Sequence, residues 1–172
     1  MGLAEALAAE QPFASPAAPP VDARVARSLL SRLTRLGASN WRLLAEALPA
    51  VVGASLAIRV QPFKRVAARA SQGGGARRIQ ESELRRMRWA VEAWAQRVPW
   101  RALCFERGLA LHTMLRRRDV PSVLHYGIVN GPQGIEAHVW VSLDGHTLIG
   151  GNEAPRFTCV AEFPGRADLP IG

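Results

Sequence analysis

The sequence pattern changes at Pro121, and this change constrains the fold class. Upstream of Pro121, apolar residues recur every three or four positions in several segments, as they do on amphipathic helices. Downstream, they alternate with polar residues in short runs that are separated by turn residues, as in β-strands. Because the helical segments come first and the strands follow, we expect an α+β protein with N-terminal helices and a small antiparallel sheet.

Four β-like runs are expected after Pro121. Asp144-Gly145 is a strong two-residue hairpin signal, since both residue types accept the positive φ angles of such a turn. Asn130-Gly131-Pro132 is expected to form the preceding turn. The expected strands cover residues 122–129, 135–143, 147–149 and 157–163.

Five helical segments are expected before Pro121, at residues 21–36, 41–59, 61–71, 83–98 and 103–118. Ser39 or Asn40 is the expected cap of the second helix, which Pro49 and Gly53 should kink or break. Overall we expect one globular domain, divided into a disordered proline-rich arm (1–21), a helical lead-in (22–72) and a core (73–172) that opens on the flexible glycines 73–75.

The location of the protein is inferred from its N-terminus, its apolar stretches and its cysteines. Residues 1–10 carry glutamates where a signal peptide would be basic, and two cysteines do not make a disulfide framework. The longest uncharged run in the apolar second helix has 12 residues, whereas about 20 are needed to span a bilayer. We therefore expect a cytoplasmic protein without a membrane span.

The net charge of +8 is concentrated in residues 59–88, which hold nine Lys and Arg residues against two Glu. Such a stretch is either a solvated basic face or a surface for an acidic partner such as a peptide. Because the charge lies in one block and almost all of it is arginine, nucleic-acid binding is not the expected function.

Cys104 and His138 are the candidate catalytic pair. Cys104 falls in the first turn of the helix expected at 103–118, where free N–H groups favour a thiolate. It shares a helical stripe with Gly108, which should let the sheet approach closely, and His138 lies on one of the expected strands. The alternative is that Cys104 is a small core residue and His138 a structural one.

The segment LCFERGLALHTMLRRRDVPSVLHYGI, followed by EAHVWVSLDG, resembles the leader peptidases of lasso-peptide biosynthesis, the B2 proteins. These are transglutaminase-like, papain-related cysteine enzymes. The resemblance covers residues 84–163 well and residues 41–70 more loosely.

The resemblance implies a transglutaminase-like core in which Cys104 is the nucleophile and His138 the general base of amide hydrolysis. The reaction would release the leader of a precursor peptide, with the Cys104 N–H as one oxyanion donor. It also implies two partner proteins, a separate leader-recognition protein and the ring-closing lasso cyclase. No cofactor is implied.

The third catalytic residue is expected to differ from the family's Asp. Asp144 is six residues from His138, about 20 Å along a strand, and the hairpin turn already explains it. Antiparallel pairing should instead bring residues 150–153 opposite His138. Asn152 is preferred, because its amide oxygen can accept a bond from Nδ1–H of the ring, followed by Glu153 and then Asp144.

Two neighbouring residues have simpler interpretations. Trp140 shares the strand face of His138 and either lines the substrate cleft or packs in the core. His112 lies two helical turns beyond Cys104, about 12 Å away, which is too far for the base.

The remaining histidines and the second cysteine are expected to play no part in the reaction. His125 and His146 are expected at the surface, and Cys159 is expected to be structural. No histidine has metal-ligand spacing with Cys104 or Cys159, so no structural zinc is expected.

Two other functions remain open. A transglutaminase-like acyl transferase would use the same nucleophile and base. A non-catalytic adaptor would bind an acidic partner through residues 59–88 and bury Cys104.

Overall fold

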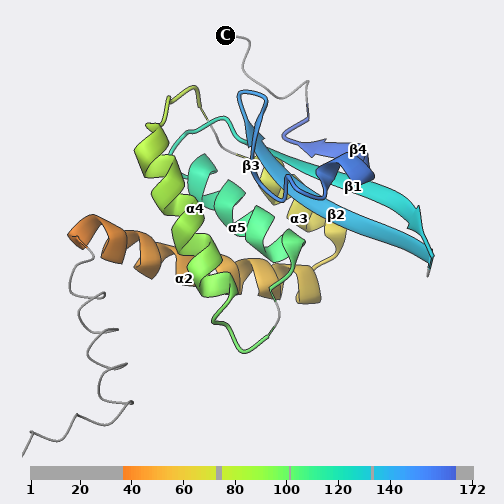
Figure 1. The fold of residues 1–172 in the computed structure, drawn as a ribbon, viewed down its shortest axis with the longest axis horizontal. Coiled ribbons are helices and arrows are strands. Elements are labelled where there is room, and N and C mark those ends of the chain that lie inside the picture. Colours follow the sequence, from red (N-terminus) through yellow and green to blue (C-terminus); the bar gives the residue numbers. More distant parts are fainter. Residues whose placement is uncertain (1–36, 73–74, 101, 133, 166–172) are drawn as a thin grey trace, which may run out of the picture. The chain divides into compact units, whose positions relative to one another are not determined.

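The computed structural model describes residues 37–72, 75–100, 102–132 and 134–165. These residues form four helices followed by a four-stranded antiparallel sheet, which confirms the α+β class (Figure 1). The elements are α2 (Ala38–Val60), α3 (Phe63–Ser71), α4 (Glu81–Ala95), α5 (Cys104–Arg116), β1 (Val123–Gly131), β2 (Gly134–Leu143), β3 (His146–Ile149), the short 3-10 helix η1 (Ala154–Arg156) and β4 (Thr158–Phe163). The arm expected at 1–21, the helix expected at 21–36 and glycines 73–74 lie outside the described residues.

Helix α5 forms the middle layer of the described fold. One side packs on β2 and β1, and the other packs on α2 and α4 (Figure 1). A helix enclosed on both sides must be apolar around most of its circumference. Accordingly, its buried residues run almost without interruption along its second half: Gly108, Leu109, Ala110, Leu111, His112, Met114, Leu115 and Arg116.

Helix α2 differs from expectation at its start and in its middle. It begins at Ala38 with Gly37 as the N-cap, so neither Ser39 nor Asn40 caps it. The Ser39 hydroxyl instead accepts a hydrogen bond from Arg86 Nη1 of α4 at 3.1 Å. The helix continues without a break through Pro49, because packing against α4 and α5 outweighs the local cost of proline.

By length and composition alone, α2 is long and apolar enough to cross a membrane, contrary to the expectation from its longest uncharged run. One side, which includes Leu43, Ala47 and Val51, is buried in the core, whereas Leu56 and Val60 on the other side are exposed. In this structure α2 is therefore a core helix with part of its apolar surface uncovered.

The strands are ordered β3-β2-β1-β4, and all neighbours are antiparallel. Asp144 and Gly145 join β2 to β3 with φ angles of 49° and 78°, which confirms the hairpin turn predicted there. In the β1–β2 pairing, His138 lies opposite Gly127 and Trp140 lies opposite His125. The short strand β3 pairs with β2 only from Val141 to Leu143, so His138 lies beyond its end.

The sheet approaches α5 closely at Gly108, as the sequence predicted. A Cβ at this position would lie 2.9 Å from Val139 Cγ1 and 3.7 Å from Val141 Cγ2. Val139 and Val141 therefore face α5. Because successive strand residues point to opposite faces, His138 and Trp140 belong to the face turned away from α5.

The close contact predicts opposite effects for two helical glycines. Gly108→Ala gains about 1 kcal/mol of helix propensity but forces Val139 to move, which costs about 1–3 kcal/mol, so the free energy of unfolding should fall. Gly53→Ala in α2 is the matched control, since nothing lies within 4 Å of the added Cβ, and it should raise the free energy of unfolding by about 1 kcal/mol. Urea unfolding of both variants measures this, and stabilisation by Gly108→Ala would contradict the packing.

His112 ties α5 to two other segments of the chain. Its side chain is buried, with Nε2 at 2.8 Å from the Ala70 carbonyl of α3 and Nδ1 at 3.0 Å from Ser122 Oγ. A carbonyl can only accept, so Nε2 carries the hydrogen and Nδ1 accepts from the Ser122 hydroxyl. Burial is the main cause that lowers the pKa of His112 to about 4.

This buried histidine predicts a loss of stability on acidification. Between pH 6.5 and about pH 4 the unfolded state binds a proton at His112 that the folded state does not, so stability is full above pH 6.5 and falls toward pH 4. Urea unfolding at pH 7.5 and 4.5 should show a drop about 2–3 kcal/mol larger in the wild type than in His112→Gln. Equal drops in both proteins would assign the pH dependence to other groups.

Candidate active site

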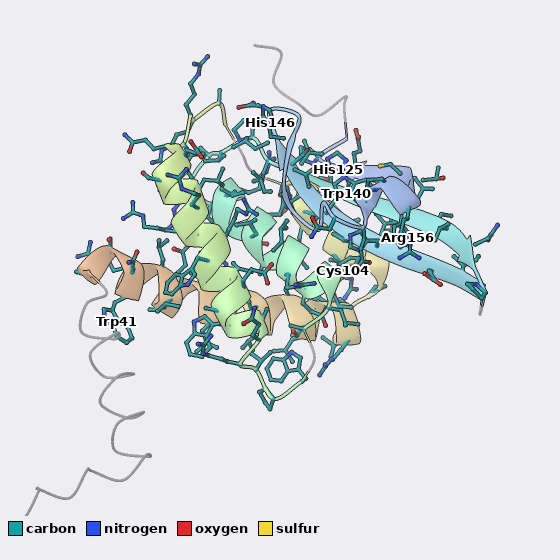
Figure 2. The ribbon with its side chains drawn as sticks, viewed as in Figure 1. Trp41, Cys104, His125, Trp140, His146 and Arg156 are labelled. Atoms are coloured by element: carbon teal, nitrogen blue, oxygen red, sulfur yellow. The ribbon has the colours of Figure 1, made fainter. Side chains whose placement is uncertain are left out.

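Cys104 is the first residue of α5 and thus lies in the first turn, where the sequence predicted it, and its thiol is free and half-buried (Figure 2). The turn is fixed by Glu106, whose buried carboxylate accepts a hydrogen bond from the Leu103 N–H at 2.9 Å. Leu103 has no side-chain oxygen, so only this half of a capping box is formed. The first bond within the helix runs from Arg107 N–H to the Leu103 carbonyl, which leaves the Cys104 N–H ahead of the helical ladder.

His138 is held on β2 by a backbone carbonyl. Its side chain is buried, and Nε2 lies 2.8 Å from the Gly150 carbonyl oxygen. Since that oxygen can only accept, the neutral ring carries its hydrogen on Nε2, and Nδ1 keeps the lone pair that can accept a proton. The ring also stacks on Phe157, with centroids 5.0 Å apart, and on Trp140 at 6.1 Å.

The Gly150 carbonyl reaches His138 because residue 150 is a glycine. Gly150 has a φ of +78°, and a Cβ there would lie 2.6 Å from the Val139 carbonyl oxygen. Only a glycine lets the chain turn so close to β2 at this point. The Gly150-Gly151 pair after β3 is the sequence signal that could have indicated that the backbone comes close to β2 here. It could not have indicated that a carbonyl bonds His138, because every residue has a backbone carbonyl.

A cavity of 410 Å³ connects His138 with the helices. Asn152 and Glu153 line it, so the structure brings His138 together with the region expected opposite it. Neither side chain bonds the ring, and both residues are exposed. Asp144 is not part of this site, since it lines a different cavity of 730 Å³ beside residues 76–79 and 121–123.

The helical side of the cavity is charged, a feature that sequence reasoning missed. It is lined by Arg88 and Glu92 of α4 and by Arg107 of α5, and Arg107 Nη1 lies 3.2 Å from Glu92 Oε2. Arg107 Nε is buried and has no hydrogen-bond partner among the described residues. These groups can bind the polar backbone of a peptide.

Cys104 does not line this cavity, but it is three residues before Arg107 on the same side of α5. Among the described residues its sulfur makes no hydrogen bond or ion pair. Cys104 and His138 lie on two elements in contact, α5 and β2, but their side chains form no hydrogen bond with each other. His138 lies on the face of the sheet turned away from α5, so the structure does not bring the predicted pair into direct contact. Arg107 therefore connects the first turn of α5, which carries Cys104, with the cavity that His138 lines.

Trp140 packs against two imidazole rings on the outer face of the sheet. Its ring stacks on His125 at 5.3 Å, nearly parallel (Figure 2), and its centroid lies 6.1 Å from that of the His138 ring. Gly127 makes room for it, because a Cβ there would lie 2.7 Å from Trp140 Cζ3. Trp140 is therefore packed on the sheet surface and does not line the cavity.

Comparison with known proteins gives one match. A family model described as the transglutaminase-like superfamily matches residues 47–162, well over half of the chain. The matched range includes Cys104, His138 and Asn152. No curated protein and no solved structure matches the chain.

The hydrogen bond that His138 donates to the Gly150 carbonyl predicts which nitrogen of the ring is protonated. Long-range proton–nitrogen NMR on the neutral ring should find the hydrogen on Nε2. Gly150→Ala should mix the two tautomers, because its Cβ would displace the carbonyl. Gly145→Ala is the matched control, since Gly145 has the same φ of +78° but open space around it. A hydrogen on Nδ1 in the wild type would contradict the assignment.

Proposed function

We propose that this chain, which belongs to the transglutaminase-like superfamily, is a cysteine peptidase with Cys104 as nucleophile and His138 as general base. One observation carries the proposal: the Gly150 carbonyl occupies Nε2 of His138 and leaves Nδ1 as a proton acceptor. The position of Cys104 as the first residue of α5 supports the other half of the pair, since free N–H groups stabilise a thiolate there.

The proposed reaction is amide hydrolysis through a thioester. His138 Nδ1 takes the thiol proton, and Cys104 Sγ attacks the carbonyl carbon of the scissile amide. The Cys104 backbone N–H donates to the oxyanion of the tetrahedral intermediate. His138 then gives its proton to the leaving amine, and a water molecule, deprotonated by the same nitrogen, hydrolyses the thioester.

In this mechanism the peptide lies where the cavity meets the first turn of α5. The scissile carbonyl must reach Sγ and Nδ1 together, so the chain would run past Arg107 and His138. Arg107 and Arg88 favour a peptide with acidic residues or exposed carbonyls near the cleavage site. Asn152 remains our choice for a further polar residue of the site, because it lines the same cavity. Nε2–H of His138 already donates to the Gly150 carbonyl and Nδ1 is the proton acceptor, so the neutral ring has no N–H left for the Asn152 amide oxygen.

The finer proposal is that the substrate is a lasso-peptide precursor and the product its separated leader. It is supported by the resemblance of residues 84–163 to the leader peptidases of lasso-peptide biosynthesis. A separate leader-recognition protein would present the precursor, and the lasso cyclase would take the released core. Acyl transfer to an amine is the second candidate, because the superfamily includes acyltransferases that share this nucleophile and base.

The test mixes the full chain with a leader-recognition protein and a lasso precursor, and follows cleavage by mass spectrometry. Cys104→Ala should lower the rate at least about 1,000-fold and His138→Gln about 100- to 10,000-fold. His146→Gln is the matched control, since His146 is an exposed residue of β3, and it should cleave at the wild-type rate.

The products separate the remaining alternatives. Leader release with water as acceptor supports the peptidase, whereas amide products formed with an added amine would show acyl transfer. Unchanged cleavage in Cys104→Ala would overturn the catalytic proposal. Cleavage of an unrelated peptide, but not of a lasso precursor, would leave the chemistry standing and overturn the substrate.

A further inference from the structure

A second cluster of reactive side chains lies on the outer face of the sheet, across β1 and β4. It consists of His125 of β1 and of Cys159 and Glu162 of β4, whose ligand atoms all lie within 4.8 Å of one another. His125 Nδ1 is 3.9 Å from Cys159 Sγ and 3.3 Å from Glu162 Oε1. His125 was expected at the surface, but its side chain is only 14% exposed.

An irregularity in β-pairing brings Cys159 to this cluster. His125 pairs with Glu162 and Tyr126 with Ala161, but Gly127 pairs with Cys159, so Val160 is an extra residue in β4. In a regular strand Val160 would follow Glu162 on this face and Cys159 would point to the other. The bulge turns the cysteine toward the histidine, and such bulges commonly re-aim a side chain.

The geometry does not fit a catalytic triad. A triad uses the two nitrogens of a histidine for different partners, one for the nucleophile and one for the acid. Here Cys159 and Glu162 both approach Nδ1, and Nε2 lies 2.7 Å from Ser142 Oγ. The sulfur and the carboxylate thus converge on one nitrogen, while a hydrogen bond on the far nitrogen fixes the ring.

This arrangement has the features of a metal site. Thiolate, imidazole and carboxylate are the three ligand types of zinc, and zinc–ligand bonds of about 2.0–2.3 Å separate tetrahedral ligands by about 3.3–3.6 Å. The two distances from Nδ1, 3.3 and 3.9 Å, are close to that range. The hydrogen bond with Ser142 is of the kind that orients a histidine ligand.

We propose that His125 Nδ1, Cys159 Sγ and the Glu162 carboxylate bind one Zn²⁺ ion, which leaves the fourth coordination position open. Binding forms the Zn–S bond and releases the thiol proton to solvent. The ion would fasten the edge strand β4 to β1. This proposal is independent of the proposed peptidase reaction, since it uses neither Cys104 nor His138.

The charges of the three side chains favour a cation as the partner of this cluster. The imidazole supplies a neutral lone pair, whereas the thiolate and the carboxylate are anionic when they bind. A cation at the centre would compensate both negative charges.

No sequence pattern indicates this site, because the three ligands come together only in the tertiary structure. His125 and Cys159 are 34 residues apart, and Cys159-x-x-Glu162 would put its two ligands on opposite faces of a regular strand. The expectation of no zinc considered only spacing along the chain, which does not show the bulge in β4.

The test is a titration of the full chain, freed of metal by a chelator, with Co²⁺ and then Zn²⁺. Co²⁺ should give a thiolate-to-metal charge-transfer absorption that saturates at one equivalent, and Zn²⁺ should displace it. Cys159→Ala should abolish the absorption, and Ser142→Ala should weaken the affinity about 10- to 100-fold. Cys104→Ala is the matched control, because it removes the other cysteine, and it should bind as the wild type does.

Thermal unfolding supplies a second readout. Saturating Zn²⁺ should raise the melting temperature of the wild type and of Cys104→Ala by several degrees, but not that of Cys159→Ala or His125→Asn. An absorption that persists in Cys159→Ala, that disappears in Cys104→Ala, or that fails to saturate below about 100-fold molar excess would overturn the site. Cys159 is exposed, so its substitution should leave the fold intact.

Discussion

The contact between Gly108 of α5 and Val139 of β2 determines the arrangement of the rest of the domain. It sets the helix directly on the sheet, because a side chain at residue 108 would force the two apart. Because Val139 faces α5, the alternation of side chains along β2 places His138 and Trp140 on the opposite face of the sheet. The same packing holds α5, the helix that begins at Cys104, against β2.

The second constraint is the short length of β3, which leaves the edge of β2 uncovered beside His138. Gly150 closes this edge, and its positive φ lets a carbonyl point at the imidazole. A side chain at residue 150 would meet the Val139 carbonyl, so the chain could not approach. The backbone thus supplies to His138 the hydrogen-bond acceptor that an acid or an amide would supply in a three-residue catalytic arrangement.

Sequence patterns predicted the elements well, because helices and strands here have strong periodicity and clear turn residues. Three local features were predictable because each depends on residue type at a known spacing: the close approach of the sheet at Gly108, the hairpin turn at Asp144-Gly145 and the helix start near Cys104. The Gly150 carbonyl and the bulge at Val160 were not, because strand register and backbone approach depend on tertiary packing. The match over residues 47–162 shows that the chain belongs to the transglutaminase-like superfamily.

The surroundings of His138 also explain how a site without a carboxylate on the ring could stabilise an imidazolium. When Nδ1 takes the thiol proton in the proposed reaction, the charge spreads over both nitrogens, and the Gly150 carbonyl dipole lies at one of them. Phe157 and Trp140 stack on the ring, and their electron-rich faces attract a cation. A neutral carbonyl and two aromatic faces supply less negative charge to the ring than a carboxylate does. A thiol is a suitable nucleophile in such surroundings, because it needs less help to ionise than a serine hydroxyl would.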